Sequence, residues 1–266
     1  MRRPPVVALL HGWPVTAAHW RFLSPALRAA GFEVIELSPP GLGAATPDSQ
    51  ALDKESLARW ALTELDAAGA GCFALVGHDW GGSIAALGAG LAPERTWALV
   101  VEEEILPGVD VALKEPGAST YPQWHGAFNR EPGLAEGLLA GRENAYLRAF
   151  LDRSAGPLGL AGEAIEGYLA AYAAEGSFAS SLALYRTRAA DQAAVDGLRR
   201  TPFPGPAMAL GGAYGMGAAV SRGLTGLAHD VMPLVLADSG HYPAEQEPEL
   251  TIGALVPFLR KHAPSA

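Results

Sequence analysis

The feature that most constrains the fold is the hexapeptide G-H-D-W-G-G at residues 77–82, which follows a strand-like run and opens a helix-like run. It has the form G-x-nucleophile-x-G, in which small residues permit a strained strand-to-helix turn that exposes one side chain above a sheet. Here that side chain is Asp79. A carboxylate is ionised at neutral pH, so Asp79 is predicted to be a covalent nucleophile that needs no base. The alternative is an ordinary helix N-cap, which does not require glycines on both sides.

Strand-like and helix-like segments alternate around this turn. Short apolar runs occur at 5–10, 32–37, 72–77, 96–103, 206–212 and 231–240. This alternation predicts an α/β fold with a mostly parallel sheet that helices cover on both faces. Residues 109–203 lack strand-like runs and have the pattern of helices. We therefore expect a core formed by 1–108 and 204–266, with a helical cap inserted at 109–203.

Composition excludes several classes of function. The chain has 266 residues, 49% of them hydrophobic and 18% charged, as expected of a globular protein. Its net charge of −9 argues against nucleic acid as a partner, and no apolar run reaches the ~18 residues of a membrane-spanning helix. Without a Cys/His cluster or a phosphate-binding loop, we expect no metal or cofactor and a small-molecule substrate. A homo-oligomer remains open.

Cys72 is the only cysteine and lies in an apolar run, which predicts a buried, inert thiol and fits a cytoplasmic protein. Among the histidines, His241 lies in the loop after the last strand-like run, ahead of an acidic segment and the closing helix. That is the place of a catalytic base in the chain order nucleophile, acid, histidine. His19 and His229 have the pattern of surface or strand-edge residues.

With these motifs the chain resembles the epoxide hydrolase and haloalkane dehalogenase branch of the α/β-hydrolase superfamily, whose members carry G-H-D-W-G-G at this turn. The resemblance includes H-G-W-P at 11–14, S-G-H at 239–241 and the cap between them. It implies an α/β-hydrolase fold. Members usually have two strands before the H-G strand, whereas here that strand begins near residue 5. The sheet is therefore expected to have only six strands, unless the natural chain begins upstream.

The resemblance also implies further site residues. The backbone N–H groups of Trp13 and Trp80 would hold an oxyanion, and their indoles would shape the pocket floor. His11 is expected with them among the residues that bind the oxyanion or the substrate. Many relatives place the third catalytic residue, an aspartate, after the penultimate strand, but here that segment contains no acid. A family pattern E-A-P-x-P instead places Glu103 in this role, with Glu104 as the next candidate. The alternative is a set of solvated glutamates at a strand end.

Two cap residues resemble the groups with which the family protonates an epoxide oxygen. Tyr185 precedes an arginine as in the family's Y-R pair, and His125 stands in a W-H-x-x-F pattern where a tyrosine is usual. Either residue could instead serve only in packing. These residues favour hydrolysis of epoxides to vicinal diols through a hydroxyalkyl ester on Asp79. Haloalkane dehalogenation by the same triad is the alternative, although Trp13 and Gly126 depart from the dehalogenase pattern. A non-enzymatic ligand-binding protein ranks third.

Overall fold

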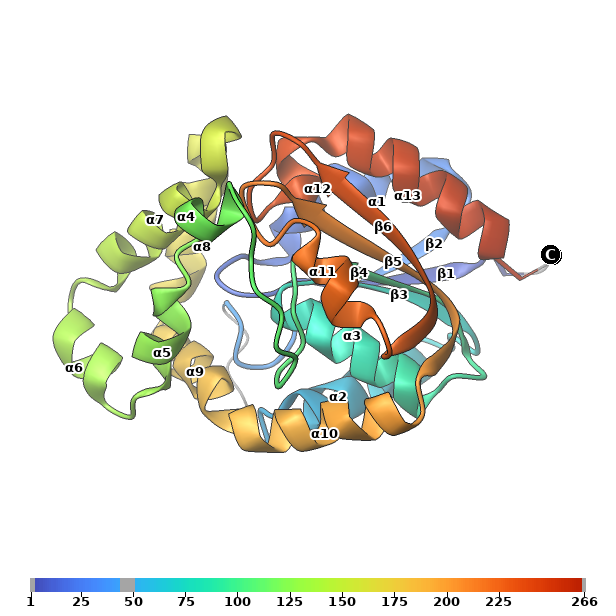
Figure 1. The fold of residues 1–266 in the computed structure, drawn as a ribbon, viewed down its shortest axis with the longest axis horizontal. Helices are drawn as coiled ribbons and strands as arrows, with labels where there is room; N and C mark the ends of the chain where they lie inside the picture. Colours follow the sequence, from blue (N-terminus) through green and yellow to red (C-terminus); the bar gives the residue numbers. More distant parts are fainter. Residues whose placement is uncertain (1–2, 44–50, 265–266) are drawn as a thin grey trace.

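A computed structural model describes residues 3–43 and 51–264, which form a six-stranded sheet flanked by helices (Figure 1). All neighbouring strands are parallel, in the order β2-β1-β3-β4-β5-β6. The strands are β1 (Val6–Leu10), β2 (Glu33–Leu37), β3 (Phe73–His78), β4 (Thr96–Glu102), β5 (Phe203–Gly212) and β6 (Ala228–Leu236). The predicted fold class, including the six parallel strands, is confirmed.

Alternate residues of each strand pack on opposite faces of the sheet, which fixes the two helical layers. In β1, Val7 and Leu9 belong to the cluster that α1 (Leu23–Ala29) and α13 (Pro248–His262) cover. The intervening Ala8 and Leu10 belong to a second, larger cluster. On that face lie α2 (Lys54–Ala67) and α3 (Trp80–Leu91). A near-continuous apolar run in each central strand is therefore needed, because both of its faces are buried.

Seven α-helices and two 3-10 turns lie between β4 and β5 in the described chain, and we call them the cap helices. Figure 1 shows most of them gathered at one side of the sheet, with α10 running along α2 and α3. They are α4 (Gly117–Thr120), α5 (Trp124–Arg130), α6 (Leu134–Leu139), α7 (Glu143–Ser154), η2 (Gly156–Leu158), α8 (Gly162–Tyr172), α9 (Ser177–Ala183), η3 (Leu184–Thr187) and α10 (Arg188–Arg200). The division into separate core and cap domains remains a prediction.

The remaining elements are η1 (Ala17–Trp20), α11 (Ala219–Leu224) and α12 (Pro243–Gln246). The prediction of a buried Cys72 is wrong, because its side chain is exposed. The strand begins only at Phe73, so Cys72 lies in the preceding turn. No helix in the two described stretches combines the length and the apolar character needed to cross a membrane.

Candidate active site

The turn between β3 and α3 holds Asp79 in a backbone conformation that residues with side chains rarely adopt. Its φ is 50° and its ψ is −129°, a conformation that costs about 1–3 kcal/mol and persists only where the surroundings enforce it. A Cβ atom at Gly77 would lie 2.0 Å from the carbonyl oxygen of Gly81. One at Gly81 would lie 2.1 Å from the carbonyl oxygen of Leu10. The tight turn therefore requires glycine on both sides of Asp79.

Asp79 occupies the N-cap position of α3, but its side chain makes no capping hydrogen bond. Its Oδ1 atom instead accepts a hydrogen bond from the Trp13 backbone N–H at 2.8 Å. Gly12 permits this approach, since a Cβ atom there would lie 2.4 Å from Asp79 Cβ. Trp80 is the first residue of α3, so its backbone N–H has no acceptor within the helix. The carboxylate is thus held by a backbone N–H of the loop after β1, and it does not cap the N-terminus of α3.

His241 and Glu103 continue a line of polar groups from Asp79. His241 Nε2 lies 3.3 Å from Asp79 Oδ2, without the alignment of a hydrogen bond. On the other side of the ring, Nδ1 donates to Glu103 Oε2 at 3.0 Å. Glu103 has a φ of 50° and follows the last residue of β4. Its carboxylate also accepts from the backbone N–H groups of Gly212 at 2.7 Å and Met216 at 2.9 Å. The acid-free segment after β5 therefore contributes backbone donors to the acid at the end of β4.

The two carboxylates beside His241 control its protonation. Burial of the ring disfavours the charged form, but Asp79 and Glu103 outweigh that cost and raise the pKa of His241 to about 9. The ring is therefore an imidazolium at neutral pH. A reaction that neutralised Asp79 would remove one of these two carboxylates and would lower the pKa of His241.

The three successive glutamates are all buried, and each faces a different partner. Glu102 Oε1 accepts from the Ala244 backbone N–H at 2.8 Å. Glu103 binds His241, and Glu104 accepts a short hydrogen bond from the Ser83 hydroxyl. Burial, reinforced by the negative charge of Asp79, raises the pKa of Glu104 to about 8. The alternative of solvated glutamates is thus inconsistent with the structure, and of the two candidate acids only Glu103 contacts the histidine.

His19 is fully buried, and its placement at the surface or a strand edge is a wrong prediction. Its Nδ1 atom lies 3.0 Å from Glu245 Oε1, and its Nε2 atom lies 3.4 Å from Glu102 Oε2. Burial lowers the pKa of His19, but these two carboxylates outweigh it and raise the value to about 9. The loop with His241 is fixed nearby, since the His78 ring lies 2.8 Å from the His241 carbonyl oxygen. His19, Glu102 and Glu245 thus form a buried charged cluster close to His241.

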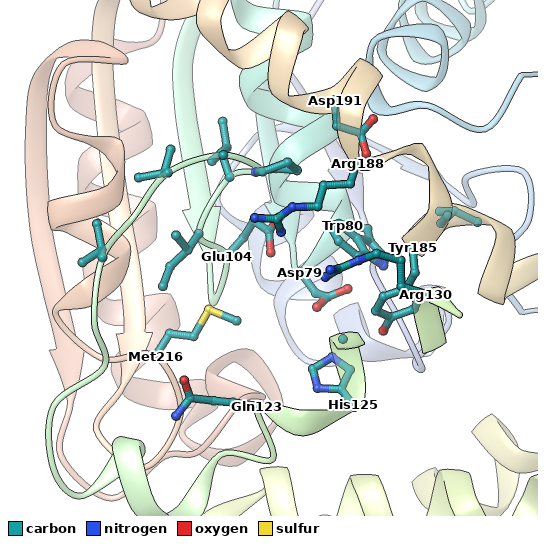
Figure 2. Close-up of a pocket in the computed structure, with 18 of the residues that line it drawn as sticks. Asp79, Trp80, Glu104, Gln123, His125, Arg130, Tyr185, Arg188, Asp191 and Met216 are labelled. Atoms are coloured by element: carbon teal, nitrogen blue, oxygen red, sulfur yellow. The ribbon is translucent and has the colours of Figure 1, made fainter. Parts of the chain in front are cut away.

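Asp79 opens into a pocket of about 310 Å³ between the sheet and the cap helices (Figure 2). Trp80 and Glu104 line the core side, and His125 and Tyr185 line the cap side. The structure therefore brings both predicted cap residues to the same cavity as Asp79.

The Tyr185 hydroxyl is buried and makes no hydrogen bond of normal geometry with the described residues. Burial raises the pKa of Tyr185 well above its usual range, so the hydroxyl stays protonated. His125 differs, because its Nδ1 atom lies 2.7 Å from the Pro122 carbonyl oxygen and must donate to it. Burial lowers the pKa of His125 to about 4. The neutral ring therefore has an unprotonated Nε2 atom, which can accept a hydrogen bond but not donate one.

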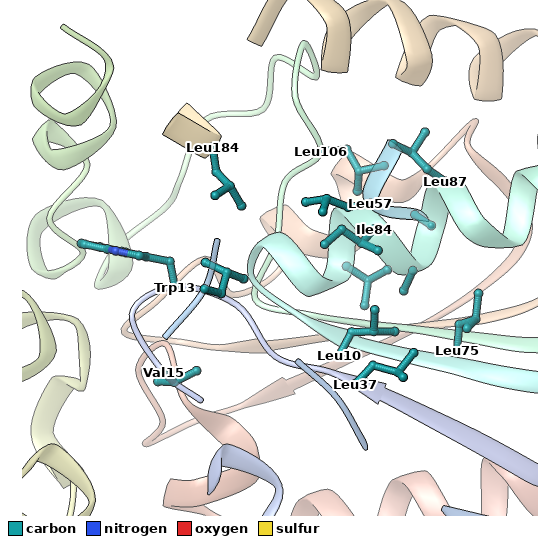
Figure 3. Close-up of a cluster of buried hydrophobic side chains, with 14 of the residues drawn as sticks. Leu10, Trp13, Val15, Leu37, Leu57, Leu75, Ile84, Leu87, Leu106 and Leu184 are labelled. Carbon is teal, nitrogen blue, oxygen red and sulfur yellow. The ribbon is translucent and has the colours of Figure 1, made fainter. Parts of the chain in front are cut away.

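The Trp13 side chain supports these cap residues and does not line the pocket. Its ring stacks on His125 at 5.7 Å and meets the edge of Tyr185 at 5.6 Å. It belongs to the buried cluster that runs from Leu10 on the sheet to Leu184 in the cap (Figure 3). The Trp13 indole N–H donates a hydrogen bond to Ser181 Oγ at 3.2 Å. Only the Trp80 indole is thus placed as the expected pocket wall.

His11 is also buried away from the pocket lining. Its Nδ1 atom lies 3.1 Å from the Gly12 carbonyl oxygen, and burial lowers its pKa to about 4. A residue that the sequence did not single out contacts two residues of the pocket lining, Trp80 and Asp191. Lys54 is fully buried, with its ammonium 4.0 Å from the Trp80 ring centre and 3.1 Å from Asp191 Oδ2. No sequence motif marks these contacts, because Lys54, Trp80 and Asp191 come from three different helices, α2, α3 and α10.

No group of three or more His, Cys, Asp or Glu side chains among residues 3–43 and 51–264 is arranged to hold a metal ion.

Known proteins are similar to this chain along nearly its whole length. A model of the alpha/beta hydrolase fold family matches residues 5–248. The soluble epoxide hydrolase of Corynebacterium sp. (strain C12) is 27% identical over 267 residues, which cover 95% of this chain and 89% of that protein. Cfl2 from Burkholderia cenocepacia has a TM-score of 0.87 at 26% identity, covering 99% of this chain and 90% of that one. Epoxide hydrolase CorEH without ligand has a TM-score of 0.86 at 25% identity, covering 97% and 92% respectively.

Proposed function

The chain belongs to the α/β-hydrolase fold family, and on that premise we propose that it hydrolyses epoxides to vicinal diols through a covalent ester on Asp79. The observation that carries the proposal is the carboxylate on the strained turn, aligned with His241 and Glu103 and facing an unpartnered tyrosine hydroxyl across the pocket. A serine at position 79 would be needed for ester hydrolysis through an acyl-serine. The similarity to proteins named epoxide hydrolases supports the same conclusion.

In the first step, Asp79 Oδ2 attacks one carbon of the epoxide and the bond between that carbon and the ring oxygen breaks. Tyr185 is the donor for the departing oxygen, because its buried hydroxyl is protonated and no described residue accepts a hydrogen bond of normal geometry from it. The products of this step are a hydroxyalkyl ester, in which Asp79 is uncharged, and a Tyr185 phenolate. The phenolate takes back a proton from the His241 imidazolium, which leaves a neutral ring that can act as a base. The Asp79 Oδ1 atom becomes the ester carbonyl and keeps its hydrogen bond from the Trp13 N–H.

His125 has a more limited role in this proposal. Its neutral ring directs the only N–H toward Pro122, so it can donate to the epoxide oxygen only as an imidazolium. With a pKa of about 4, that form is rare at neutral pH. Tyr185 therefore acts as the principal donor, and His125 positions it through the aromatic contact at 5.7 Å.

In the second step, His241 removes a proton from water and the resulting hydroxide attacks Asp79 Cγ. The histidine can do this because ester formation removes the charge of Asp79, which lowers the pKa of the ring. Glu103 keeps the Nδ1 proton in place and stabilises the imidazolium that forms. The negative charge that develops on Oδ1 is stabilised by the backbone N–H of Trp13, assisted by that of Trp80. Collapse of this intermediate breaks the bond between Cγ and the substrate oxygen, which takes up the proton that entered with the hydroxide, so that the diol is released and the carboxylate is regenerated.

The decisive experiment is a single turnover of styrene oxide in ¹⁸O-water, with enzyme in excess, followed by mass analysis of the diol and of the peptide that contains Asp79. The proposal predicts an unlabelled diol and one ¹⁸O atom in Asp79, since the water oxygen enters the carboxylate. Asp79→Ala should remain folded and inactive. Label in the diol, with none in the peptide, would show direct attack by water and would exclude the ester.

Haloalkane dehalogenation is a second candidate because the Trp80 indole N–H is buried beside the pocket without an acceptor. An indole N–H of this kind can bind a halide as it leaves a carbon that Asp79 attacks. The same labelling experiment with a haloalkane separates the two reactions. Halide release with label in Asp79, and no turnover of epoxides, would establish the dehalogenase.

A further inference from the structure

We propose that Arg130 and Arg188 form an anion subsite in this pocket, and that the substrate is a compact epoxide that carries a carboxylate. The inference rests on the proposed function, because it names the substrate class of the same site. Arg130 is the last residue of α5 and Arg188 is the first residue of α10, so the two come from separate cap helices. Both line the pocket that contains Asp79.

Neither arginine has a carboxylate partner in the part of the chain that the structure describes. Figure 2 shows both side chains extending from the cap toward the middle of the pocket. The Arg130 Nε atom is buried and has no hydrogen-bond partner within residues 3–43 and 51–264. Arg186, between them in the chain, also has a buried Nε without a described partner, but its guanidinium is paired with Glu136 at 2.6 Å, and Arg130 has no such carboxylate among the described residues. A buried guanidinium N–H without an acceptor is costly, and a bound anion would satisfy it.

The acids of the pocket do not neutralise these two arginines. Asp191 is already paired with Lys54 at 3.1 Å. Burial and the charge of Asp79 raise the pKa of Glu104 to about 8, so this side chain is largely neutral at pH 7. Asp79 shares the charged ring of His241 with Glu103, so this group of three leaves one negative charge against the two positive charges of the arginines. The pocket thus has an excess of positive charge on the side where the guanidinium groups lie, and a planar guanidinium is well suited to a carboxylate.

The apolar part of the pocket lining indicates what the rest of the substrate is. The segment after β4 contributes apolar side chains there, among them Leu106, Val109 and Leu113. An apolar body against this wall, with a carboxylate toward the arginines, would use both sides of the cavity. A volume of about 310 Å³ suits a compact body such as an aryl or short alkyl group. The inferred class is therefore a small aryl or alkyl epoxide with one carboxylate.

Binding can be tested without turnover by calorimetry with a series of ω-phenylalkanoates, from phenylacetate to 4-phenylbutyrate, each compared with its neutral amide. We expect at least one carboxylate to bind about tenfold more tightly than its amide, a preference that added salt should weaken. Arg130→Gln should abolish the preference, and Arg188→Gln, at an exposed position that tolerates substitution, should reduce it severalfold. Arg153→Gln, which removes an exposed charge from α7 outside the pocket, is the matched control and should change nothing.

Turnover then separates this inference from the proposed function. The ratio of kcat/KM for 4-(oxiran-2-yl)benzoate to that for 4-methylstyrene oxide should exceed one and should fall in both pocket variants. If carboxylates bind with dependence on the arginines but no epoxide is opened, the subsite stands and the proposed reaction is wrong. If epoxides are opened but carboxylates bind no better than amides, and the variants behave like the wild type, the subsite is wrong and the reaction stands.

Discussion

The two oxygen atoms of Asp79 have different surroundings, and this difference orders the proposed reaction. Oδ1 is held by the Trp13 N–H, whereas Oδ2 lies beside His241 Nε2. An ester formed through Oδ2 leaves Oδ1 as the carbonyl oxygen, next to a backbone donor that is already in place. The site therefore does not need to reorganise between formation of the ester and its hydrolysis, which is the main advantage of preorganised donors.

Replacing the base should separate the two steps. His241→Gln keeps a polar side chain of similar size but cannot accept a proton from water, so the ester on Asp79 should accumulate. Mass spectrometry of the intact protein after mixing with styrene oxide should show one added substrate per chain, on the peptide that contains Asp79. The wild-type protein, quenched under the same conditions at the end of turnover, should show none. Steady diol production by the variant, with Asp79 unmodified, would contradict the role of His241.

Replacing the proton donor should slow the first step without weakening the fold. Tyr185→Phe should lower the rate constant of ester formation about 10²-fold, the typical contribution of one positioned acid. Its melting temperature should be unchanged or higher, because the variant loses a buried hydroxyl that lies near Asn129 but makes no hydrogen bond of normal geometry with the described residues. His125→Asn should have a smaller effect on the rate at pH 7. Rapid quenching of single turnovers measures the rate constant of ester formation in each variant. Equal losses in the two variants would mean that His125 contributes as much as Tyr185 to protonation of the epoxide oxygen.

At the level of helices and strands, the local hydrophobic pattern predicted most of the architecture. The predicted strands agree with the structure within a few residues, and all the described helices between β4 and β5 lie within the predicted span 109–203, because periodicity within a short window is visible in one sequence. The choice between Glu103 and Glu104 was not visible, because it depends on the positive φ of Glu103. The buried state of His19 depends on Glu102 and Glu245, which are 83 and 226 residues away. Contacts of that kind follow from the tertiary fold and from no local pattern.

The strand-to-helix turn gives a test at this scale. Gly81→Ala would place a Cβ atom 2.1 Å from the Leu10 carbonyl oxygen, so α3 would have to move away from β1. We expect a large loss of stability or no folded protein. Gly167→Ala is the matched control, since a Cβ atom there meets nothing within 4 Å in the exposed face of α8. That variant should be more stable by about 0.5–1 kcal/mol, the usual gain for alanine inside a helix. Thermal unfolding of both proteins gives the comparison.

Across the whole molecule, buried titratable groups link stability to pH. The pKa values of His19 and His241 are raised to about 9, and that of Glu104 is raised to about 8. In the unfolded chain these groups lose their protons near 6.5 and 4.5. Between pH 6.5 and 8 the folded protein therefore binds more protons than the unfolded chain. Histidines with lowered pKa values, such as His11 and His125, are neutral in the folded protein but half protonated in the unfolded chain at pH 6.5. They therefore make the slope shallower near pH 6.5 and contribute little near pH 8.

The sign of this linkage predicts that the free energy of unfolding falls as pH rises from 6.5 to 8. Each proton that only the folded protein retains contributes a slope of about 1.4 kcal/mol per pH unit. Glu104→Gln replaces the neutral carboxyl with a group that does not titrate. The free energy of unfolding of this variant should therefore fall less steeply with pH, by the contribution of about one proton. Glu94→Gln, at an exposed site, is the control and should keep the wild-type slope. Urea unfolding at four pH values within this window measures the slopes. A free energy that stays constant or rises would mean that the buried imidazolium groups and the neutral Glu104 do not exist in the folded protein.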